Sequence, residues 1–259
     1  MSGDSIGKRV ALSFLRNYAE FGSRGHLFSA RALQERMRST ENSEERKLLA
    51  IKVYAEFIAA LEDLGALCIA ICHRNEGVGL VYSYLTYGQP RRPKSPKTTV
   101  KQMFGMTIQG NALTSALHLP SLAEISKLAP DSSVIPQLYE ETNILLTQAA
   151  SAYLLHDSAF VRAYNKTKHG FVVVSDEHTF QADDPHYLSD ACWIVSDNPE
   201  YDPDKAPTNP VVELFLVEEK NVDPMVERIG TIRGAVVTLC ELTANLLEKD
   251  IITSADDKA

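Results

Sequence analysis

Apolar residues recur every three or four positions along two long stretches of the chain. The first stretch runs from Ser43 to Arg74, with acidic residues in its first turn and Ser43 as the predicted N-cap. From Leu64 onward it is apolar on nearly every side, which predicts a helix covered by several neighbours. The second stretch extends from Ser132 to Lys168, with Pro136 near its first turn. The two patterns predict two long helices.

Shorter patterns predict the remaining helical elements. We expect a helix over 27–37, after a turn at 21–25. A second helix should start at Ser95 and Pro96 and end near Phe104. One or two short helical pieces are expected over 113–129, where Pro120-Ser121 starts the second piece. A last helix is expected from Asp223 to Glu248, with Pro224 at its start.

Three β-branched runs lie between the second long helix and the last one. They are FVVV after Gly170, ACWIV over 191–195 and VVELFLV over 211–217, separated by clusters of Asp, Pro and Asn. The predicted fold class is therefore mainly α: a helical bundle of two long helices and a C-terminal helix, with a small antiparallel β-sheet inserted before the last helix. We expect a single helical domain over 1–259, the β insertion at 171–218 and a disordered tail at 250–259.

Composition and charge narrow the classes of function. The chain has 259 residues, 44% hydrophobic and 23% charged, and no apolar run approaches the roughly 20 residues of a membrane-spanning helix. We expect a cytoplasmic protein without a membrane partner, because the N-terminus lacks an apolar signal region. The net charge of -8 argues against nonspecific binding of nucleic acid by the whole surface. A local basic patch that binds nucleic acid is still compatible with this net charge.

Candidate metal and cofactor chemistry is sparse. Cys68 and Cys72 share a helical face, but no Cys-x-x-Cys pair exists, so buried reduced thiols are favoured over a metal pair. No phosphate-loop, dinucleotide-binding or hydrolase motif occurs, and we predict no metal site and no cofactor. Tyr82 and Tyr84 precede a run of cations at 91–97. This region fits either a single-stranded nucleic-acid contact or a solvated loop beside partly buried tyrosines.

The stretch FVRAYNKTKHGFVVV, residues 160–174, carries the densest set of polar side chains. At helical spacing, Arg162, Asn165, Lys166 and His169 share one side. Gly170 fits the residue that closes a helix, which places His169 in the last turn, where the helix dipole favours its charged form. An imidazole beside a guanidinium is suited to proton donation or phosphate binding. The same residues also fit ordinary capping of a helix C-terminus, so both interpretations stay open.

Arg162 and His169, in an R-x6-H arrangement, resemble the Arg-x(4–6)-His signature of the HEPN superfamily (higher eukaryotes and prokaryotes nucleotide-binding). The resemblance implies a helical bundle that dimerises and brings two arginines and two histidines over an RNA backbone. It implies a metal-independent endoribonuclease in which Arg162 binds the scissile phosphate and His169 assists proton transfer. Asn165, Lys166 and Lys168 would then bind phosphate or RNA. By family analogy, the setting would be a bacterial stress or phage-defence response.

The resemblance further implies an acidic residue on a neighbouring helix that orients the arginine. Glu56 and Asp63 are the candidates, because they lie seven positions apart and so share a face of the first long helix. The predicted partners are RNA, a second copy of the chain and, less directly, another protein. The sequence leaves open whether the protein is an enzyme. The alternative function is a noncatalytic helical module that binds a protein partner or a ligand.

Overall fold

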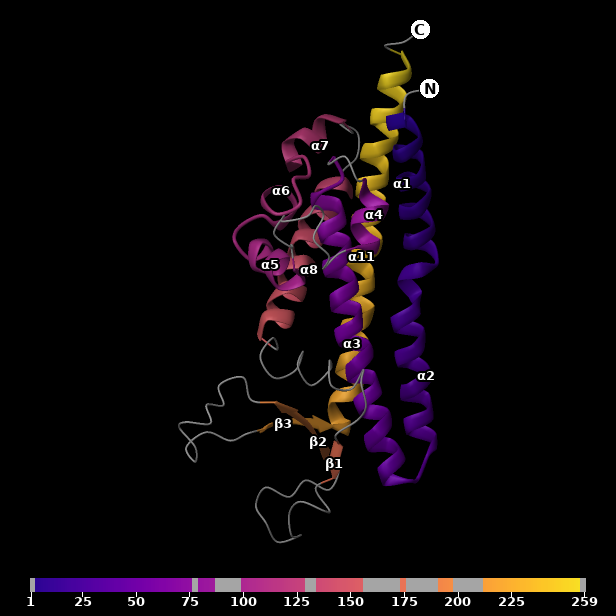
Figure 1. Ribbon diagram of the computed structural model, residues 1–259, viewed down its shortest axis with the longest axis vertical. Helices are drawn as coiled ribbons and strands as arrows, with labels where there is room; N and C mark the ends of the chain where they lie inside the picture. Colours follow the sequence, from indigo (N-terminus) through magenta and orange to yellow (C-terminus); the bar gives the residue numbers. More distant parts are fainter. Residues whose placement is uncertain are drawn as a thin grey trace. The chain divides into compact units, whose positions relative to one another are not determined.

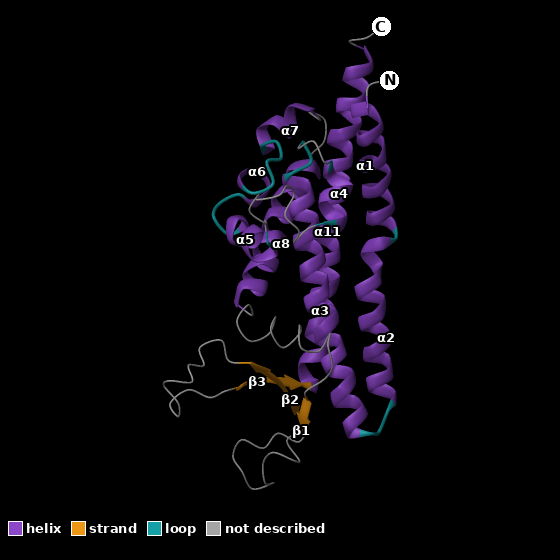
Figure 2. Cartoon of the chain, viewed as in Figure 1, coloured by secondary structure: helices purple, strands orange, loops and turns teal. Residues whose placement is uncertain are grey.

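The computed structural model describes residues 3–75, 79–86, 99–128, 134–155, 173–175, 191–197 and 212–256, and these are mainly helical (Figures 1 and 2). The predicted mainly α class is confirmed. The helices are α1 (Gly3–Glu20), α2 (Gly25–Ser39), α3 (Ser43–Cys72), α4 (Leu80–Leu85), α5 (Val100–Thr107), α6 (Ala112–Ser115), α7 (Leu122–Leu128), α8 (Val134–Leu155) and α11 (Val222–Asp256). Short 3-10 turns, Gly22–Arg24 and Glu219–Asn221, precede α2 and α11.

Three short strands precede α11 in the chain. They are β1 (Val173–Ser175), β2 (Ala191–Asp197) and β3 (Val212–Glu218). β2 pairs antiparallel with both neighbours, in the order β1-β2-β3, and Ile194 lies opposite Val173 on one side and Phe215 on the other. β3 leads directly into the 3-10 turn and α11.

The described chain divides into two compact units, whereas the sequence predicted one domain. The first unit contains α1, residues 60–72 of α3, the helices from α4 to α8 and α11 from residue 230. The second contains residues 26–59 and the strands together with the start of α11. Each unit has its own interior, so each is described by itself below.

The first unit is built around the C-terminal half of α3. From Leu64 to Ile71 this segment is apolar on nearly every side, as the sequence predicted, and its side chains are buried. The fully buried ones include Leu61, Leu64, Leu67, Cys68, Ile69 and Ile71. α5 and α8 also contact each other, since the rings of Phe104 and Tyr153 lie 5.2 Å apart. Burial of this segment supplies the hydrophobic driving force for the unit.

Two helix starts differ from the prediction. The N-cap of α3 is Asn42, whose Oδ1 accepts a hydrogen bond from the Glu45 backbone N–H at 3.0 Å, and Ser43 is already helical. α5 begins at Val100, because Thr99 is extended and forms a capping box with Gln102. A helix that runs unbroken from Ser95 to Phe104 is therefore wrong. Residues 87–98 lie outside the described part of the chain.

The later helices follow the sequence more closely. α7 starts where Pro120-Ser121 predicted, and Ser121 and Glu124 exchange the hydrogen bonds of a capping box. α11 continues past Glu248, its predicted end, to Asp256, so residues 250–256 are helical and not a disordered tail. α1 had no counterpart among the predicted helices.

In the second unit, α2 packs against α3 and the start of α11 through polar contacts. Arg36 donates to Glu45 at 2.8 Å, and both Gln34 and Arg38 donate to Asp223 in the first turn of α11. The hydrogen bonds from Gln34 and then Arg38 hold the pKa of Asp223 below its ordinary value. Because these groups are mostly exposed, the contacts fix orientation more than they add stability.

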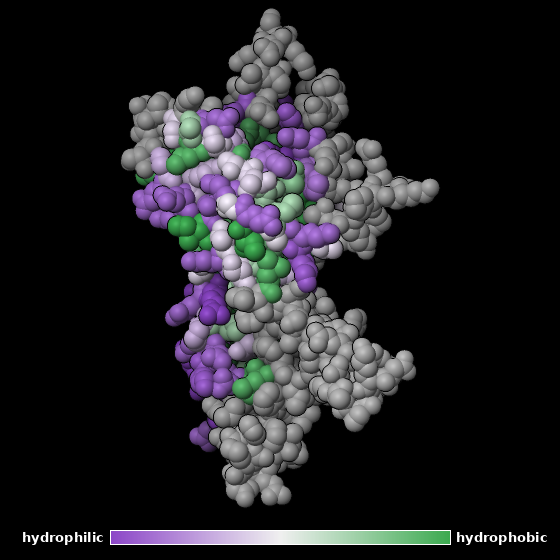
Figure 3. Space-filling view, turned by 90° about the vertical axis from the view of Figure 1, so that its left-hand side faces the viewer, coloured by the Kyte–Doolittle hydropathy of each residue, from purple (hydrophilic) through white to green (hydrophobic). Residues whose placement is uncertain are grey.

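The surface mixes polar and apolar side chains. Figure 3 shows one face, on which apolar residues emerge in small groups among polar ones. The largest exposed apolar side chains include Phe21, Phe28 and Leu85. Over the described helices, none combines the length and the apolar character that crossing a membrane would need.

Arg74 fastens the end of α3 to the turn after α6. Its guanidinium donates to the carbonyls of Ile71 and Leu117, each at 2.8 Å, and of His118 at 2.6 Å. His118 has a φ of 52°, a left-handed conformation that costs a non-glycine residue about 1 kcal/mol. These charge-assisted bonds hold the strained turn in place.

Replacement of Arg74 by methionine is expected to lower the free energy of unfolding by about 1–2 kcal/mol, since part of the lost hydrogen bonding is replaced by water. Urea unfolding would measure the loss. Arg31→Met, at an exposed position of α2, is the control and should leave stability unchanged. Equal midpoints for both variants would show that Arg74 does not fasten the turn.

Candidate functional site

The predicted RNA site falls outside the described part of the chain. Arg162, Asn165, Lys166, Lys168 and His169 all lie within 156–172, which the structure does not describe. Their roles as catalytic and phosphate-binding residues stay predictions. The two predicted orienting acids, Glu56 and Asp63, are described, and each has a well-defined partner on another helix.

Glu56 pairs with His26 between α3 and α2. Its Oε2 lies 2.8 Å from the His26 Nδ1, and both side chains are partly exposed. The same carboxylate lines a shallow surface groove with Phe28 and Lys52. Glu56 therefore lies at the surface of the second unit, with a partner that is charged only when the imidazole is protonated. Whether it also meets Arg162 is not tested, because Arg162 is not described.

Asp63 lies in a cluster formed by α1, α3 and α4. The Tyr18 hydroxyl donates to its Oδ2 and the Tyr84 hydroxyl donates to its Oδ1. The two phenol oxygens are themselves 3.1 Å apart. Phe14 stacks on the Tyr18 ring at 5.5 Å and tilts against the Tyr84 ring at 5.2 Å. The carboxyl group thus lies behind three aromatic rings from two other helices.

Counting protons indicates which form of Asp63 suits this cluster. The three oxygen pairs form a closed ring, and the two phenols carry one proton each. If Asp63 is ionised, two protons serve three contacts. If Asp63 is protonated, Tyr84 donates to Tyr18, Tyr18 donates to Asp63 and the carboxyl proton goes to Tyr84, so every contact is a hydrogen bond. Burial also raises the pKa of Asp63 above its ordinary value, although the hydrogen bond from Tyr84 opposes this.

Sequence reasoning selected Asp63 but not its partners. Tyr18 lies in α1, which was not predicted, and Tyr84 was considered only as part of an aromatic run beside cations. The interpretation of partly buried tyrosines is confirmed for Tyr84, whereas Tyr82 is 51% exposed. The available signal was an acidic residue directly before the apolar part of α3, because an acid that is buried there requires hydrogen-bonding partners.

Two cysteines of the first unit, Cys68 and Cys240, lie in the apolar interior. Cys68 and Cys240 are buried, and burial is the main cause that raises both pKa values, that of Cys240 to about 12. Nearby Asp63 adds to the shift at Cys240. The favoured interpretation of Cys68 as a buried reduced thiol is confirmed. Among the described residues, His, Cys, Asp and Glu do not gather in groups of three or more that would hold a metal ion.

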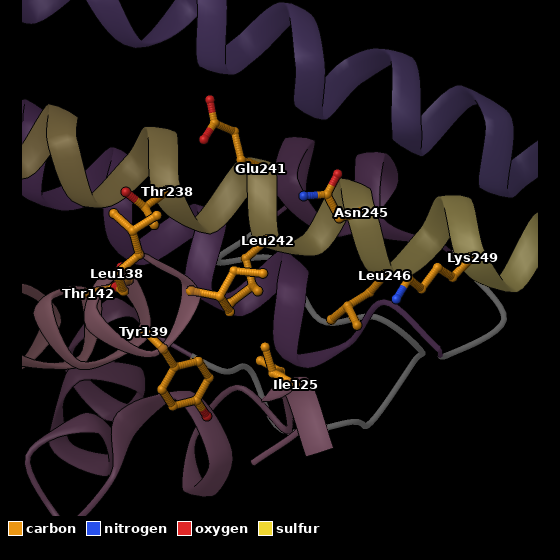
Figure 4. A pocket seen from close by; sticks show the side chains of 11 residues that line it. Ile125, Leu138, Tyr139, Thr142, Thr238, Glu241, Leu242, Asn245, Leu246 and Lys249 are labelled. Carbon is orange, nitrogen blue, oxygen red and sulfur yellow. The ribbon is translucent and has the colours of Figure 1, made fainter. Parts of the chain in front are cut away.

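A cavity of about 150 Å³ lies between α7, α8 and α11 in the first unit (Figure 4). Leu242 and Leu246 point from α11 toward Leu138, Tyr139 and Ile125 on the opposite helices. Glu241 and Asn245 belong to the same lining but point to the other side of α11 in this view. The remaining lining residues are Ile135, Thr142, Thr238 and Lys249. The cavity lies next to the buried core, and the surface of its wall is mostly apolar.

Comparison of the chain with protein-family models, with curated proteins and with solved structures finds no match in any of the three. The functional argument therefore depends on the residues themselves.

Proposed function

We propose that this chain is a HEPN-like RNA-binding or RNA-cleaving protein that needs no metal ion. The observation that carries the proposal is the spacing of Arg162, Asn165, Lys166 and His169, which places them on one side of a predicted helix. The mainly helical architecture supports it, because the signature belongs to helical bundles. A role in bacterial stress or phage defence, and action as a homodimer, are parts of the same proposal.

In this proposal, Arg162 binds the nonbridging oxygens of a phosphodiester through paired N–H donors. The ribose 2′-oxygen forms a bond to phosphorus while the bond from phosphorus to the 5′-oxygen breaks. His169 takes the proton from the 2′-hydroxyl or gives one to the leaving 5′-oxygen. Lys166 and Lys168 bind neighbouring phosphates. A second copy of the chain would supply the second histidine, so that one imidazole acts as base while the other acts as acid.

Glu56 and Asp63 differ in how well they suit the orienting role. Both Asp63 oxygens are engaged by phenols, and its pKa is raised, which is the opposite of what a nearby guanidinium would cause. Glu56 is partly exposed, and its described partner is a histidine. We therefore favour Glu56 as the acid that orients Arg162.

The test is cleavage of end-labelled single-stranded RNA in the presence of EDTA. The wild-type chain is expected to cleave, and Arg162→Ala and His169→Ala are each expected to lose about a hundredfold or more of the rate, in the range typical for a positioned acid or base. Arg31→Ala, an exposed cation of α2, is the matched control and should cleave normally. Equal cleavage by all variants would overturn the assignment of the two residues.

The second candidate function is a noncatalytic helical module that binds a ligand or a protein partner. The apolar cavity between α7, α8 and α11 is the observation that favours it. Intact RNA with the wild-type chain and with every variant, together with unchanged anisotropy of a fluorescent RNA, would favour this module over the ribonuclease.

A further inference from the structure

The three hydroxyl groups in the wall of the α7–α8–α11 cavity already have partners in the protein backbone. The Tyr139 hydroxyl donates to the Pro120 carbonyl at 2.9 Å. Thr142 donates to the carbonyl of Leu138 at 2.6 Å, and Thr238 donates to that of Gly234 at 3.0 Å. Because these three hydroxyl groups already donate to backbone carbonyls, they have no hydrogen-bond proton left to offer a water molecule or a polar ligand.

The charged lining residues do not make the recess polar. Glu241 projects to the other side of α11, and Lys249 lies at the end of the recess beside Leu246 (Figure 4). The floor is closed by Ile125 and Tyr139, which are 4% and 3% exposed. Leu138 is 43% exposed, which leaves a route from solvent that needs no unfolding. The recess is therefore apolar, bounded and accessible.

From this geometry we propose that the cavity is a binding site for a small uncharged apolar ligand, about the size of one aromatic ring or a short branched hydrocarbon chain. An apolar space of about 150 Å³ has room for a molecule the size of benzene, as enclosed protein cavities of this volume show. An empty recess of this kind also loses packing contacts that a ligand of matching size restores. The site uses residues of α7, α8 and α11 alone and does not depend on Arg162 or His169.

The probe for this site is toluene, titrated into full-length protein labelled at its Ile and Leu methyl groups. We expect saturable shifts of the methyl signals of Ile125, Ile135, Leu138, Leu242 and Leu246, and little change for Ile51, which lies in the other unit.

Leu242→Phe is expected to fill the recess and to weaken toluene binding by at least about tenfold. Leu85→Phe makes the same change at a position that is 70% exposed and should leave the affinity unchanged. The wild-type titration decides the question even if Leu242→Phe does not fold. Absence of lining shifts near the solubility limit of toluene, shifts that persist in Leu242→Phe, or lining signals that depend on protein concentration without toluene would each overturn the proposal. The last result would mean that a second copy covers the recess.

Discussion

Replacement of Asp63 by leucine is expected to lower the free energy of unfolding by about 2–4 kcal/mol. It leaves the partly buried Tyr18 hydroxyl without an acceptor and the Tyr84 hydroxyl without a donor, at roughly 1–3 kcal/mol each. Replacement by asparagine should cost less than about 1 kcal/mol, since hydrogen bonds of this kind are retained. The introduced side-chain amide would donate to Tyr84 and accept from Tyr18, as the protonated carboxyl does in the closed ring. Urea unfolding of the two variants at pH 5 would measure the difference.

The free energy of unfolding should depend on pH in the way expected for a carboxyl, that of Asp63, whose pKa is raised by folding. In the unfolded chain Asp63 titrates near 3.8, and in the folded protein it titrates at a higher pH. Between these two values the folded state binds more protons, so its stability falls as the pH rises. The contribution of the neutral carboxyl is complete below the unfolded-state pKa and is lost as the pH passes the folded-state pKa. Among the described residues, the hydroxyls of Tyr18 and Tyr84 contact Asp63, and the Cys240 thiol, whose pKa burial raises to about 12, lies near it.

Asp63→Asn should therefore gain stability relative to the wild-type chain as the pH rises from the unfolded-state value of 3.8 through the folded-state pKa of the carboxyl. Tyr82→Phe is the control, since Tyr82 belongs to the same helix as Tyr84 but is exposed. A constant difference between Asp63→Asn and the wild type across this range would contradict the raised pKa. Equal losses for the leucine and asparagine variants would contradict the hydrogen-bonded ring.

The positions of the helices were predictable where the signal is local. The spacing of apolar residues predicts the length of α3, and the part from Leu64 onward predicts its own burial, because a helical segment that is apolar on nearly every side is stable only inside a protein. Capping was less predictable. Two start signals compete before α5, the Ser95-Pro96 pair and the Thr99-x-x-Gln102 box, and the structure uses the second. Proline at a first helical position and a capping box each fit a helix start, so local rules do not rank them.

The candidate site depends on contacts that local patterns do not contain. Asp63 receives its hydrogen bonds from residues 45 and 21 positions away in the chain, on helices of which one was not predicted. The apolar cavity likewise arises because the side chains of α7, α8 and α11 do not fill the space between these helices. Such a gap depends on how three helices pack together, so the sequence pattern of any one helix does not predict it. The sequence does predict that Asp63 needs a hydrogen-bonding partner, because an acid beside the apolar part of a helix must be hydrogen-bonded or neutral when it is buried.

Substitution of alanine for glycine should have opposite effects at two helical positions. Gly65 lies in the buried half of α3, where an added Cβ would come within 2.4 Å of the Val100 Cγ1 and 3.0 Å of its Cγ2. Since both methyl groups of Val100 are close, rotation of that side chain does not clear the space. Gly234 lies on the exposed side of α11, where an added Cβ meets nothing within 4 Å.

Gly234→Ala is expected to stabilise the protein by about 0.5–1 kcal/mol, the usual gain from replacing glycine inside a helix. Gly65→Ala receives the same gain but must also displace α5, which costs about 1–3 kcal/mol in a packed core. The difference between the two variants thus isolates the cost of the contact with Val100. Thermal or urea unfolding of both variants would measure it.

The double variant Gly65→Ala/Val100→Ala tests whether the contact itself is responsible. Removing the two Val100 methyl groups makes room for the new Cβ, so the double variant should be more stable than the sum of the single changes predicts. If the effects simply add, the glycine is required for a reason other than its approach to α5. A positive coupling would establish that the glycine at position 65 allows α5 to pack directly against the central helix of the first unit.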